Sequence, residues 1–337
     1  MKIALEEAKK GLTTTFPNPA VGCVIVKDNK VISVGYHHKA GEAHAEIDAL
    51  KKISFDAKDC DIYVTLEPCN HHGKTGPCTE AIIKSGAKNV YISIQDPNPQ
   101  VDGSGIERLK NAGIKVETDI LRENGEELLK YFSYNIKYSL PYVTLKVALS
   151  LNGYINREKG KRTTITNSKS YNYTLKLRER YQAVLIGINT IIVDNPSFKN
   201  MTKFVIGNRK LDKSLNIFKN SDKVYQFTSN KELTSTSYLE VIYFDKKRVD
   251  ILDILKKVFS LGYGSLFVEG GGKIFSQFIE SNLFNELYLY YAPMIISGIS
   301  RTPFIDNIDN NNINLELIES FNLENDLIVR YKNSNRN

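Results

Sequence analysis

The sequence of 337 residues contains no tryptophan, four cysteines and no run of about 18 apolar residues that could form a membrane-spanning helix. The first residues, MKIALEEAKKGL, include acidic residues and have an amphipathic pattern where a signal peptide would have an apolar block. The cysteines are too few and too unevenly spaced for a disulfide framework in a chain of this length. We therefore expect a soluble cytoplasmic protein that has no membrane partner.

A dinucleotide-binding fingerprint is also missing, because the full G-x-G-x-x-G pattern occurs nowhere in the sequence. An ordinary Rossmann domain is therefore not predicted. The composition, with 42% hydrophobic and 25% charged residues, suits a globular chain of about two domains. The net charge of +7 fits either a phosphorylated substrate or nucleic acid and does not decide between them.

Hydrophobic periodicity predicts alternating strands and helices in the first part of the chain. Residues 21–36, VGCVIVKDNKVISVGY, alternate apolar and polar side chains around Asp28-Asn29 and are typical of a hairpin. Further strands are expected at 61–66, 89–94 and 114–118, and helices at 43–53, 78–85, 105–112 and 126–138. This alternation predicts a sheet with helices packed against it.

A second pattern begins at Pro141, which opens the strand PYVTLKVAL after the helix that ends at residue 138. We therefore place a domain boundary near residue 140, between domains 1–140 and 141–337. In the second domain, strands are expected at 141–149, 183–187, 203–206, 223–227, 240–244, 265–268, 286–292 and 327–332, and helices at 168–180, 250–261 and 273–281. Residues 305–313, IDNIDNNNI, are expected to form a polar loop.

Three residues of the first domain have the pattern of a catalytic zinc site: His44, Cys69 and Cys78. Catalytic zinc takes three protein ligands and leaves one position open for water, whose pKa falls to about 7. Glu46 follows the histidine by two residues, and a carboxylate at this place can move a proton from that water to a leaving amine. H-x-E followed by P-C-x-x-C is the signature of zinc deaminases. The alternatives are a closed structural zinc site, or two inert buried thiols with a surface histidine.

The spacing between the two cysteines departs from that signature. Eight residues separate Cys69 from Cys78 in E-P-C-N-H-H-G-K-T-G-P-C, where nucleoside and tRNA deaminases have two. The insert contains basic side chains, and we expect His71 and Lys74 at the mouth of the pocket, where they would bind an anionic or highly polar ligand. The alternative is a solvated basic loop.

Polar side chains of the first domain also flank the ends of predicted strands, where α/β sheets bind ligands: Asn18, Asp96 and Asn98. The segments around these residues are T-F-P-N-P-A-V-G-C-V-I-V, G-E-A-H-A-E, T-L-E-P-C-N-H-H-G-K-T-G-P-C and Q-D-P-N-P-Q-V. Together they resemble the deaminase half of the bifunctional riboflavin-biosynthesis deaminase/reductase family, and the resemblance extends over nearly the whole chain.

This resemblance implies a cytidine-deaminase-like three-layer α/β/α fold for residues 1–140. By the same resemblance His44, Cys69 and Cys78 bind zinc, and Glu46 shuttles the proton. The residues implied to bind a pyrimidine ribosyl phosphate are Asn18, His37, His71, Lys74, Asp96 and Asn98. Gly76 stands where the family has a second proline, which should loosen the loop without affecting a ligand.

The second domain contains three motifs: K-V-A-L-S-L-N-G at 146–153, G-I-N-T-I-I-V-D-N-P at 187–196 and V-E-G-G-G-K at 268–273. A glycine-rich turn before a helix lets backbone N–H groups approach a phosphate, although E-G-G-G alone equally predicts a tight structural turn. With the first half, these segments resemble the reductase domain of the same family, which has a dihydrofolate-reductase-like α/β fold and uses NADPH.

The resemblance implies a cofactor site and a substrate site in this second domain. The implied cofactor contacts are Ala148, Thr164, Thr190, Asp194 and the run 271–277 with Gly271, Gly272 and Lys273. The implied substrate contacts are Arg162, Arg178, Phe198 and Glu269, and Lys146 is implied as a catalytic residue. Without the resemblance, Lys146 reads as a solvated strand lysine and Arg178 as one charge on a helix face.

Three departures from the family lie in this second domain. Asn152 replaces an aspartate, Thr164 replaces a common tryptophan, and the arginine that normally follows a few residues after Asp194 is missing. That arginine would bind the substrate phosphate in a bidentate fashion, which Lys199 or Lys203 cannot reproduce. One alternative is therefore a deaminase with a non-catalytic scaffold as its second domain. The other, a nucleic-acid base deaminase, requires a basic stripe with interleaved aromatics, and no such stripe is found.

We expect a bifunctional enzyme that uses Zn²⁺ and NADPH. Its first domain would deaminate 2,5-diamino-6-ribosylamino-4(3H)-pyrimidinone 5′-phosphate by hydrolysis. Its second domain would then reduce the ribosyl side chain to ribityl. The partner would be this small phosphorylated pyrimidine and not nucleic acid, and we expect a homo-oligomer, either a dimer or a tetramer.

Overall fold

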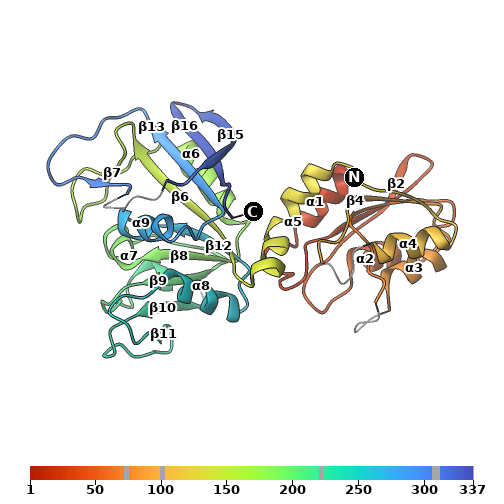
Figure 1. The fold of residues 1–337 in the computed structure, drawn as a ribbon, viewed down its shortest axis with the longest axis horizontal. Helices are drawn as coiled ribbons and strands as arrows, with labels where there is room; N and C mark the ends of the chain where they lie inside the picture. Colours follow the sequence, from red (N-terminus) through yellow and green to blue (C-terminus); the bar gives the residue numbers. More distant parts are fainter. Residues whose placement is uncertain (72–75, 99–102, 220–222, 306–311, 337) are drawn as a thin grey trace. The chain divides into compact units, whose positions relative to one another are not determined.

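The computed structural model describes residues 1–71, 76–98, 103–219, 223–305 and 312–336. The chain divides into two compact units, Met1–Ser139 and Leu140–Asn337. Within the described ranges, each unit builds its own sheets from its own strands (Figure 1).

The N-terminal unit contains a five-stranded sheet with the order β2-β1-β3-β4-β5. β1 pairs antiparallel with β2 and β3, whereas β3, β4 and β5 are parallel. The strands are β1 (Gly22–Lys27), β2 (Lys30–Tyr36), β3 (Asp61–Leu66), β4 (Asn89–Ile94) and β5 (Lys115–Glu117). The helices are α1 (Lys2–Lys9), α2 (Ala45–Lys51), α3 (Cys78–Lys84), α4 (Ser104–Asn111) and α5 (Arg122–Tyr138).

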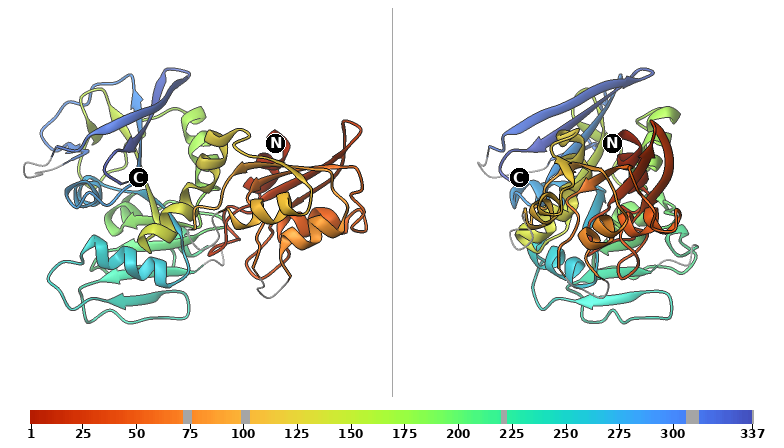
Figure 2. Two further views of the ribbon diagram at one scale, coloured as in Figure 1. Left: turned by 45° about the vertical axis from the view of Figure 1, so that its right-hand side comes forward. Right: turned by 90° about the vertical axis from the view of Figure 1, so that its right-hand side faces the viewer.

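Helices cover both faces of this sheet, and two glycines allow their close approach. Gly22 pairs with Tyr36, the neighbour of Gly35, so the two glycines face opposite sides of the sheet. A Cβ atom at Gly22 would lie 2.0 Å from the carbonyl oxygen of Ala4 in α1, and one at Gly35 would lie 2.5 Å from that of Ala45 in α2. Figures 1 and 2 show α1 and α5 on one face and α2, α3 and α4 on the other. The predicted three-layer α/β/α architecture is confirmed.

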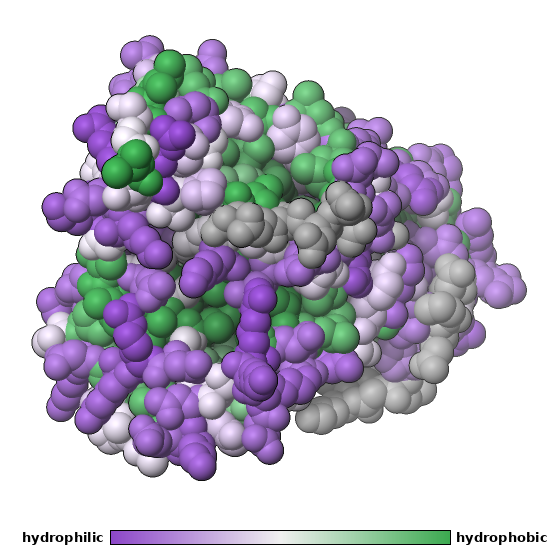
Figure 3. Space-filling model, turned by 60° about the vertical axis from the view of Figure 1, so that its left-hand side comes forward, coloured by the Kyte–Doolittle hydropathy of each residue, from purple (hydrophilic) through white to green (hydrophobic). Residues whose placement is uncertain are grey.

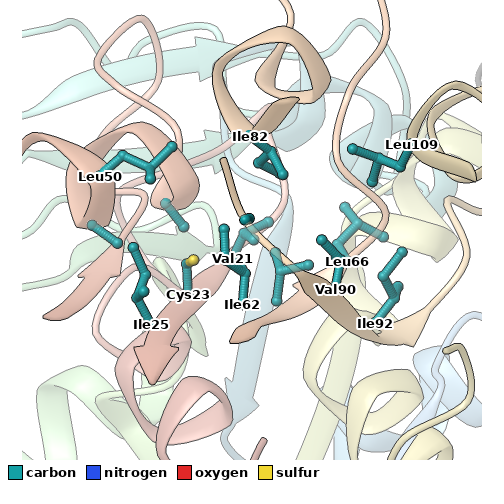
Figure 4. Packing of buried hydrophobic residues seen from close by; sticks show 14 of the residues in the cluster. Val21, Cys23, Ile25, Leu50, Ile62, Leu66, Ile82, Val90, Ile92 and Leu109 are labelled. Atoms are coloured by element: carbon teal, nitrogen blue, oxygen red, sulfur yellow. The ribbon is translucent and has the colours of Figure 1, made fainter. Parts of the chain in front are cut away.

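The core of the N-terminal unit lies between the sheet and the helices α2, α3 and α4. Figure 4 shows aliphatic side chains from β1, β3 and β4 meeting Leu50 of α2, Ile82 of α3 and Leu109 of α4, all three of which are fully buried. Burying each such side chain contributes roughly 1.5–3 kcal/mol. This packing fixes the positions of α2 and α3. Two of the predicted zinc ligands, His44 and Cys78, lie at the starts of these helices.

The C-terminal unit contains a nine-stranded sheet with the order β11-β10-β9-β8-β12-β6-β13-β16-β15. The first seven strands in this order are parallel, and β16 and β15 are antiparallel additions. The strands are β6 (Tyr142–Ser150), β8 (Ala183–Gly187), β9 (Thr202–Ile206), β10 (Val224–Thr228), β11 (Glu240–Tyr243), β12 (Ser265–Glu269), β13 (Glu286–Ala292), β15 (Leu315–Leu323) and β16 (Asp326–Asn333).

Helices and a small second sheet complete this unit. The helices are α6 (Ser168–Arg178), α7 (Ile188–Asp194), α8 (Ile251–Ser260) and α9 (Gly272–Glu280), with a 3₁₀ turn at Asn216–Phe218. β7 (Tyr154–Asn156) pairs with β14 (Thr302–Pro303) in a two-stranded sheet. Because β6, β8, β9 and β12 are parallel, their carboxyl ends meet at one edge of the large sheet, where α/β folds bind ligands.

Most elements predicted from periodicity are confirmed. The strands at 183–187 and 286–292 coincide with β8 and β13, and the other predicted strands and helices are present with ends that differ by at most four residues. The prediction did not include α1, α7, β7, β14 or β15. Within the predicted polar loop 305–313, residues 306–311 lie outside the described part of the chain.

Hydrophilic side chains cover most of the face seen in Figure 3, and patches of hydrophobic surface lie between them. None of the helices in the described ranges is long and apolar enough to cross a lipid bilayer.

Candidate functional site

Local backbone structure brings the three predicted zinc ligands together. His44 is the N-cap residue of α2, and its side chain makes no capping hydrogen bond, so the ring remains available as a ligand. Cys78 is the first residue of α3, and Cys69 follows β3 by three residues. Helix N-termini carry a partial positive charge, which favours an anionic sulfur there.

The distances between these side chains fit a tetrahedral zinc ion. The Nδ1 atom of His44 lies 3.5 Å from Cys69 Sγ and 3.3 Å from Cys78 Sγ, and the three ligand atoms lie within 4.8 Å of one another. With zinc bonds of about 2.3 Å to sulfur and 2.0–2.1 Å to nitrogen, tetrahedral angles give a nitrogen–sulfur separation of about 3.5 Å. One imidazole and two thiols supply three ligands and leave the fourth position open, as in catalytic zinc sites.

The electrostatics of the cluster favour the thiolate form of one of the two cysteines, Cys69. The pKa of the Cys69 thiol lies well below its ordinary value, first because the Cys78 thiol donates a hydrogen bond to it and then because of His44. The backbone N–H of Cys78 also donates to Cys69 Sγ, at 3.4 Å. A thiolate is the form in which cysteine binds zinc.

Glu46 lies beside this cluster on the first turn of α2. It is 3% exposed, and its Oε2 atom has no hydrogen-bond partner among the described residues. Burial, and then the negative charge of Cys69, raise the pKa of its carboxyl to about 7. A buried polar atom without a partner is costly unless something absent from the protein chain satisfies it. A water in the open zinc position would supply that partner, and a pKa near 7 suits proton transfer in both directions.

Two of the predicted substrate contacts, His37 and Asn18, are linked to the predicted zinc ligand His44. His37 is 2% exposed, and its ring lies edge to face with His44 at a centroid distance of 5.4 Å. Its Nδ1–H donates to the carbonyl oxygen of Ala43 at 2.9 Å, and the Asn18 side-chain amide donates to its Nε2 at 3.1 Å. The contact with Asn18 requires the neutral ring, because a protonated Nε2 could not accept a hydrogen bond, and burial lowers the pKa of His37 in agreement.

The other predicted contacts of this unit lie on two loops. Asp96 and Asn98 are half-buried after β4, and Asp96 Oδ1 accepts a hydrogen bond from the Asn98 backbone N–H at 2.9 Å. His71 is exposed, two residues after Cys69. Lys74 lies outside the described residues.

The second unit contains a cavity of about 960 Å³ at the carboxyl ends of β6, β8, β9 and β12. This volume is typical of ligand pockets. Of the twelve residues predicted by name for the reductase site, all but two line the cavity: Lys146, Ala148, Arg162, Thr164, Thr190, Asp194, Glu269, Gly271, Gly272 and Lys273. In the predicted run 271–277, Phe275 and Ser276 do not line it.

The remaining two, Arg178 and Phe198, lie behind Glu269 and are not among the lining residues. Arg178 donates to both carboxylate oxygens of Glu269, at 3.1 and 2.6 Å. Its guanidinium group stacks on Phe198 at 4.5 Å from the ring centroid, and Phe198 is 2% exposed. Because Arg178 is held on one side by a carboxylate and on another by a ring, the ion pair holds Glu269 at the cavity wall.

Lys146 is the one cation among the residues of β6 that line the cavity. Its Nζ lies 4.5 Å from the centroid of the Tyr290 ring, a cation–π contact. Burial lowers the pKa of Lys146, and Glu269 partly offsets this shift. A lysine with a lowered pKa loses a proton more readily than a solvated one.

Two of the departures from the family pattern have structural consequences. Asn152 donates to the Ile296 carbonyl oxygen at 2.9 Å and accepts from the Ile296 N–H at 3.0 Å, which an aspartate could not do in full. Neither Lys199 nor Lys203 lines the cavity, and Lys203 is fully buried in β9. These lysines therefore do not replace the missing arginine.

Sequence reasoning did not identify two polar residues that the structure brings to these sites. Glu67 is 3% exposed and accepts hydrogen bonds from the loop that follows β4. Arg209 lines the cavity of the C-terminal unit and donates to Asn189. Glu67 lies within the motif T-L-E-P-C, directly before the segment from Cys69 to Cys78, here called the metal loop. Its place in this motif is the only signal in the sequence that could have identified it.

The comparisons with known proteins cover both units. A family model described as the cytidine and deoxycytidylate deaminase zinc-binding region matches residues 1–94, and the RibD C-terminal domain matches residues 141–329. The riboflavin biosynthesis protein RibD of Bacillus amyloliquefaciens is 37% identical over 314 residues, which are 88% of this chain and 85% of that protein. RibD of Escherichia coli strain K12 is 33% identical over 325 residues, which are 89% of each chain.

Solved structures agree with these relatives. A Thermotoga maritima diaminohydroxyphosphoribosylaminopyrimidine deaminase/5-amino-6-(5-phosphoribosylamino)uracil reductase has a TM-score of 0.87 and 32% identity, covering 99% of this chain and 97% of that chain. Acinetobacter baumannii RibD has a TM-score of 0.84 and 31% identity. Family models match both domains, and these relatives cover nearly the whole chain. This chain therefore belongs to the RibD family of bifunctional riboflavin-biosynthesis enzymes, with a cytidine-deaminase-like domain followed by a dihydrofolate-reductase-like domain.

Proposed function

We propose that this chain catalyses two consecutive steps on one phosphorylated pyrimidine. Residues 1–140 remove an amine from 2,5-diamino-6-ribosylamino-4(3H)-pyrimidinone 5′-phosphate by hydrolysis, and residues 141–337 reduce the ribosyl group of the product to ribityl. The observation that carries this proposal is the convergence of one histidine and two cysteines at zinc-binding distances, with a buried carboxylate beside them.

In the first reaction, His44, Cys69 and Cys78 hold zinc, which when bound lowers the pKa of a water in its open position. The oxygen of the water forms a bond to the ring carbon that carries the amine, and Glu46 takes a proton from that water and delivers it to the nitrogen. The carbon–nitrogen bond then breaks and ammonia departs. Asn18 and His37 bind the polar edge of the pyrimidine, because their mutual hydrogen bond holds them beside the metal ligand His44. Asp96, Asn98, His71 and Lys74 are assigned to the same ligand.

In the second reaction, a nicotinamide cofactor supplies the hydride when bound. The glycine turn 270–272 lines the cavity at the start of α9, where backbone N–H groups suit a phosphate. We assign Lys146 as the donor of the proton that must accompany the hydride, and Arg162 and Glu269 as substrate contacts. Glu269 is fixed for this role by its ion pair with Arg178.

Arg209 supports NADPH rather than NADH as that cofactor. Dinucleotide sites for NAD use a carboxylate on the adenosine 2′-hydroxyl, whereas an arginine accommodates the 2′-phosphate of NADP. The turn after β9 is Gly207-Asn208-Arg209, with no carboxylate. Its backbone is held by the buried side chain of Gln226, which donates to the carbonyl oxygens of Gly207 and Arg209 at 2.8 Å each.

Replacing Arg209 with alanine should therefore weaken NADPH binding about 10- to 100-fold, the usual effect of losing hydrogen bonds to a charged group. NADH binding should stay the same, because NADH has no 2′-phosphate. The dissociation constants are measured by fluorescence titration of the purified protein. Lys210→Ala is the matched control, since Lys210 is the next residue, is exposed and does not line the cavity. Equal weakening for both cofactors would contradict the assignment.

The proposal as a whole is tested by the masses of the products. Protein and zinc incubated with the diaminopyrimidine phosphate should release ammonia without NADPH, and adding NADPH should add two hydrogens to the product. Ammonia release with no NADPH oxidation by the deaminated intermediate would favour a scaffold role for the second domain. The cavity with Lys146 and the paired Glu269 supports a reductase instead.

All four cysteines are free, which supports a reducing compartment such as the cytoplasm. The homo-oligomeric state, a dimer or a tetramer, stays a prediction that light scattering of the purified protein would check.

A further inference from the structure

Glu67 is a buried carboxylate with an unusual set of hydrogen-bond donors. Its Oε1 atom accepts from the backbone N–H groups of Gly105 at 2.8 Å and Ile106 at 3.2 Å. Its Oε2 atom accepts from those of Gly103 at 3.1 Å and Asp96 at 3.3 Å. Four N–H donors and the N-terminus of α4 together compensate the cost of burying this charge.

One of these donors lies near the start of the loop between β4 and α4, and the other three lie at its end and on the first turn of α4. Asp96 begins the loop, two residues after β4, and Gly103 is the N-cap residue of α4. The carboxylate thus joins the start of the loop to its end. Gly105 permits this approach, because a Cβ atom there would lie 2.1 Å from the carbonyl oxygen of Pro68 and 3.1 Å from Glu67 Oε1.

Along the chain, Glu67 leads directly into the metal loop, because Cys69 lies two residues after it. Asn70 ties the same loop to two helices. Its side-chain amide donates to the Ser104 carbonyl oxygen of α4 at 3.3 Å, and its side-chain oxygen accepts from the Thr79 hydroxyl of α3 at 3.1 Å. The metal loop and the loop after β4 are therefore connected through Glu67 and Asn70.

We propose that Glu67 is a positioning residue of the deaminase that holds the Asp96–Asn98 segment in register with the metal loop, so that the substrate's ring meets the metal at the correct place. This inference rests on the proposed function, because it uses the substrate contacts assigned to Asp96 and Asn98. Glu67 itself touches neither metal nor substrate.

The role requires a carboxylate and not merely a polar side chain of the same shape. An ionised carboxylate only accepts hydrogen bonds, and all four neighbours only donate. In Glu67→Gln one oxygen becomes an NH₂ group, which would face two backbone N–H groups and repel them. Glu67→Asp keeps both acceptors on a shorter side chain, so it should preserve part of the set.

The experiment compares Glu67→Gln, Glu67→Asp and the control Glu107→Gln, whose carboxylate is exposed on the first turn of the same helix. Each full-length protein is loaded with zinc and assayed for metal content and for ammonia release. For Glu67→Gln we expect KM to rise about tenfold, as for the loss of one well-made hydrogen bond. We expect kcat within about twofold and zinc content unchanged, with Glu67→Asp between the two and Glu107→Gln like the natural protein.

Hydrogen–deuterium exchange provides a second readout that needs no substrate. Backbone amides in peptides that include Asp96 and Gly103 to Ile106 should exchange faster in Glu67→Gln, with no change in the C-terminal unit. Unchanged exchange together with unchanged KM would overturn the proposal. Loss of zinc with a fall in kcat would also overturn it, because Glu67 would then support the metal loop itself. If the natural protein released no ammonia, the proposed function would fail, and the exchange result would still decide whether Glu67 holds the loop.

Discussion

Glu46→Gln should stop ammonia release while zinc stays bound. The glutamine has the size of the glutamate but cannot take or give the proton that the reaction moves. General acid–base groups contribute about 10²- to 10⁴-fold, and we expect the upper part of this range because one carboxylate serves both the water and the leaving amine. The ligands His44, Cys69 and Cys78 are untouched, so the metal content should not change.

The measurement is the rate of ammonia release, with zinc content determined on the same sample. Glu42→Gln is the matched control, because Glu42 is exposed four residues earlier and should have no effect. Reduction of the deaminated intermediate by the same protein should proceed at the natural rate, since its site lies in the other unit. A fall in ammonia release of less than about tenfold would mean that another group moves the proton.

Cys69→Ala should remove the metal itself. The site has three protein ligands, and alanine leaves two, too few to retain zinc against dialysis in a site of this kind. Ammonia release should fall at least as far as in Glu46→Gln, but here the zinc content falls with it. The two variants therefore separate the loss of proton transfer from the loss of the metal.

The matched control for this variant is Cys60→Ala, which removes a cysteine that is 1% exposed and belongs to no metal cluster in the described ranges. Atomic absorption on dialysed protein gives the zinc content. Stoichiometric zinc in Cys69→Ala would show that Cys69 is not a ligand and would contradict the assigned site. Adding zinc back should not restore ammonia release.

The zinc ligands could be predicted from the sequence because their chemistry restricts them to few residue types at characteristic spacings. Contacts between polar residues far apart in the sequence could not be predicted. The ion pair between Arg178 and Glu269 joins residues 91 positions apart, on α6 and β12, and only the order of strands in the sheet brings them together. Glu67 follows β3 and contacts the start of α4, which follows the neighbouring parallel strand β4. No local sequence pattern predicts that contact.

Two missed elements have local physical causes. α7 has the sequence INTIIVD, whose β-branched residues favour strands, but Ile188 and Ile191 lie one turn apart and are both buried. β15 is an edge strand whose apolar residues alternate with polar ones on each side of a bulge between Leu317 and Glu319, and this bulge interrupts the period of two by which strands are recognised. In both cases tertiary packing decides the structure.

The division of the chain at Ser139 and Leu140 has a consequence for how the two activities are inherited. A break in the coding sequence at this point would remove no strand from either large sheet. Two separate genes could therefore encode the same pair of catalysts, each with a complete hydrophobic interior. Their fusion ensures equal amounts of both catalysts in the cell, and neither half needs the other to complete its architecture.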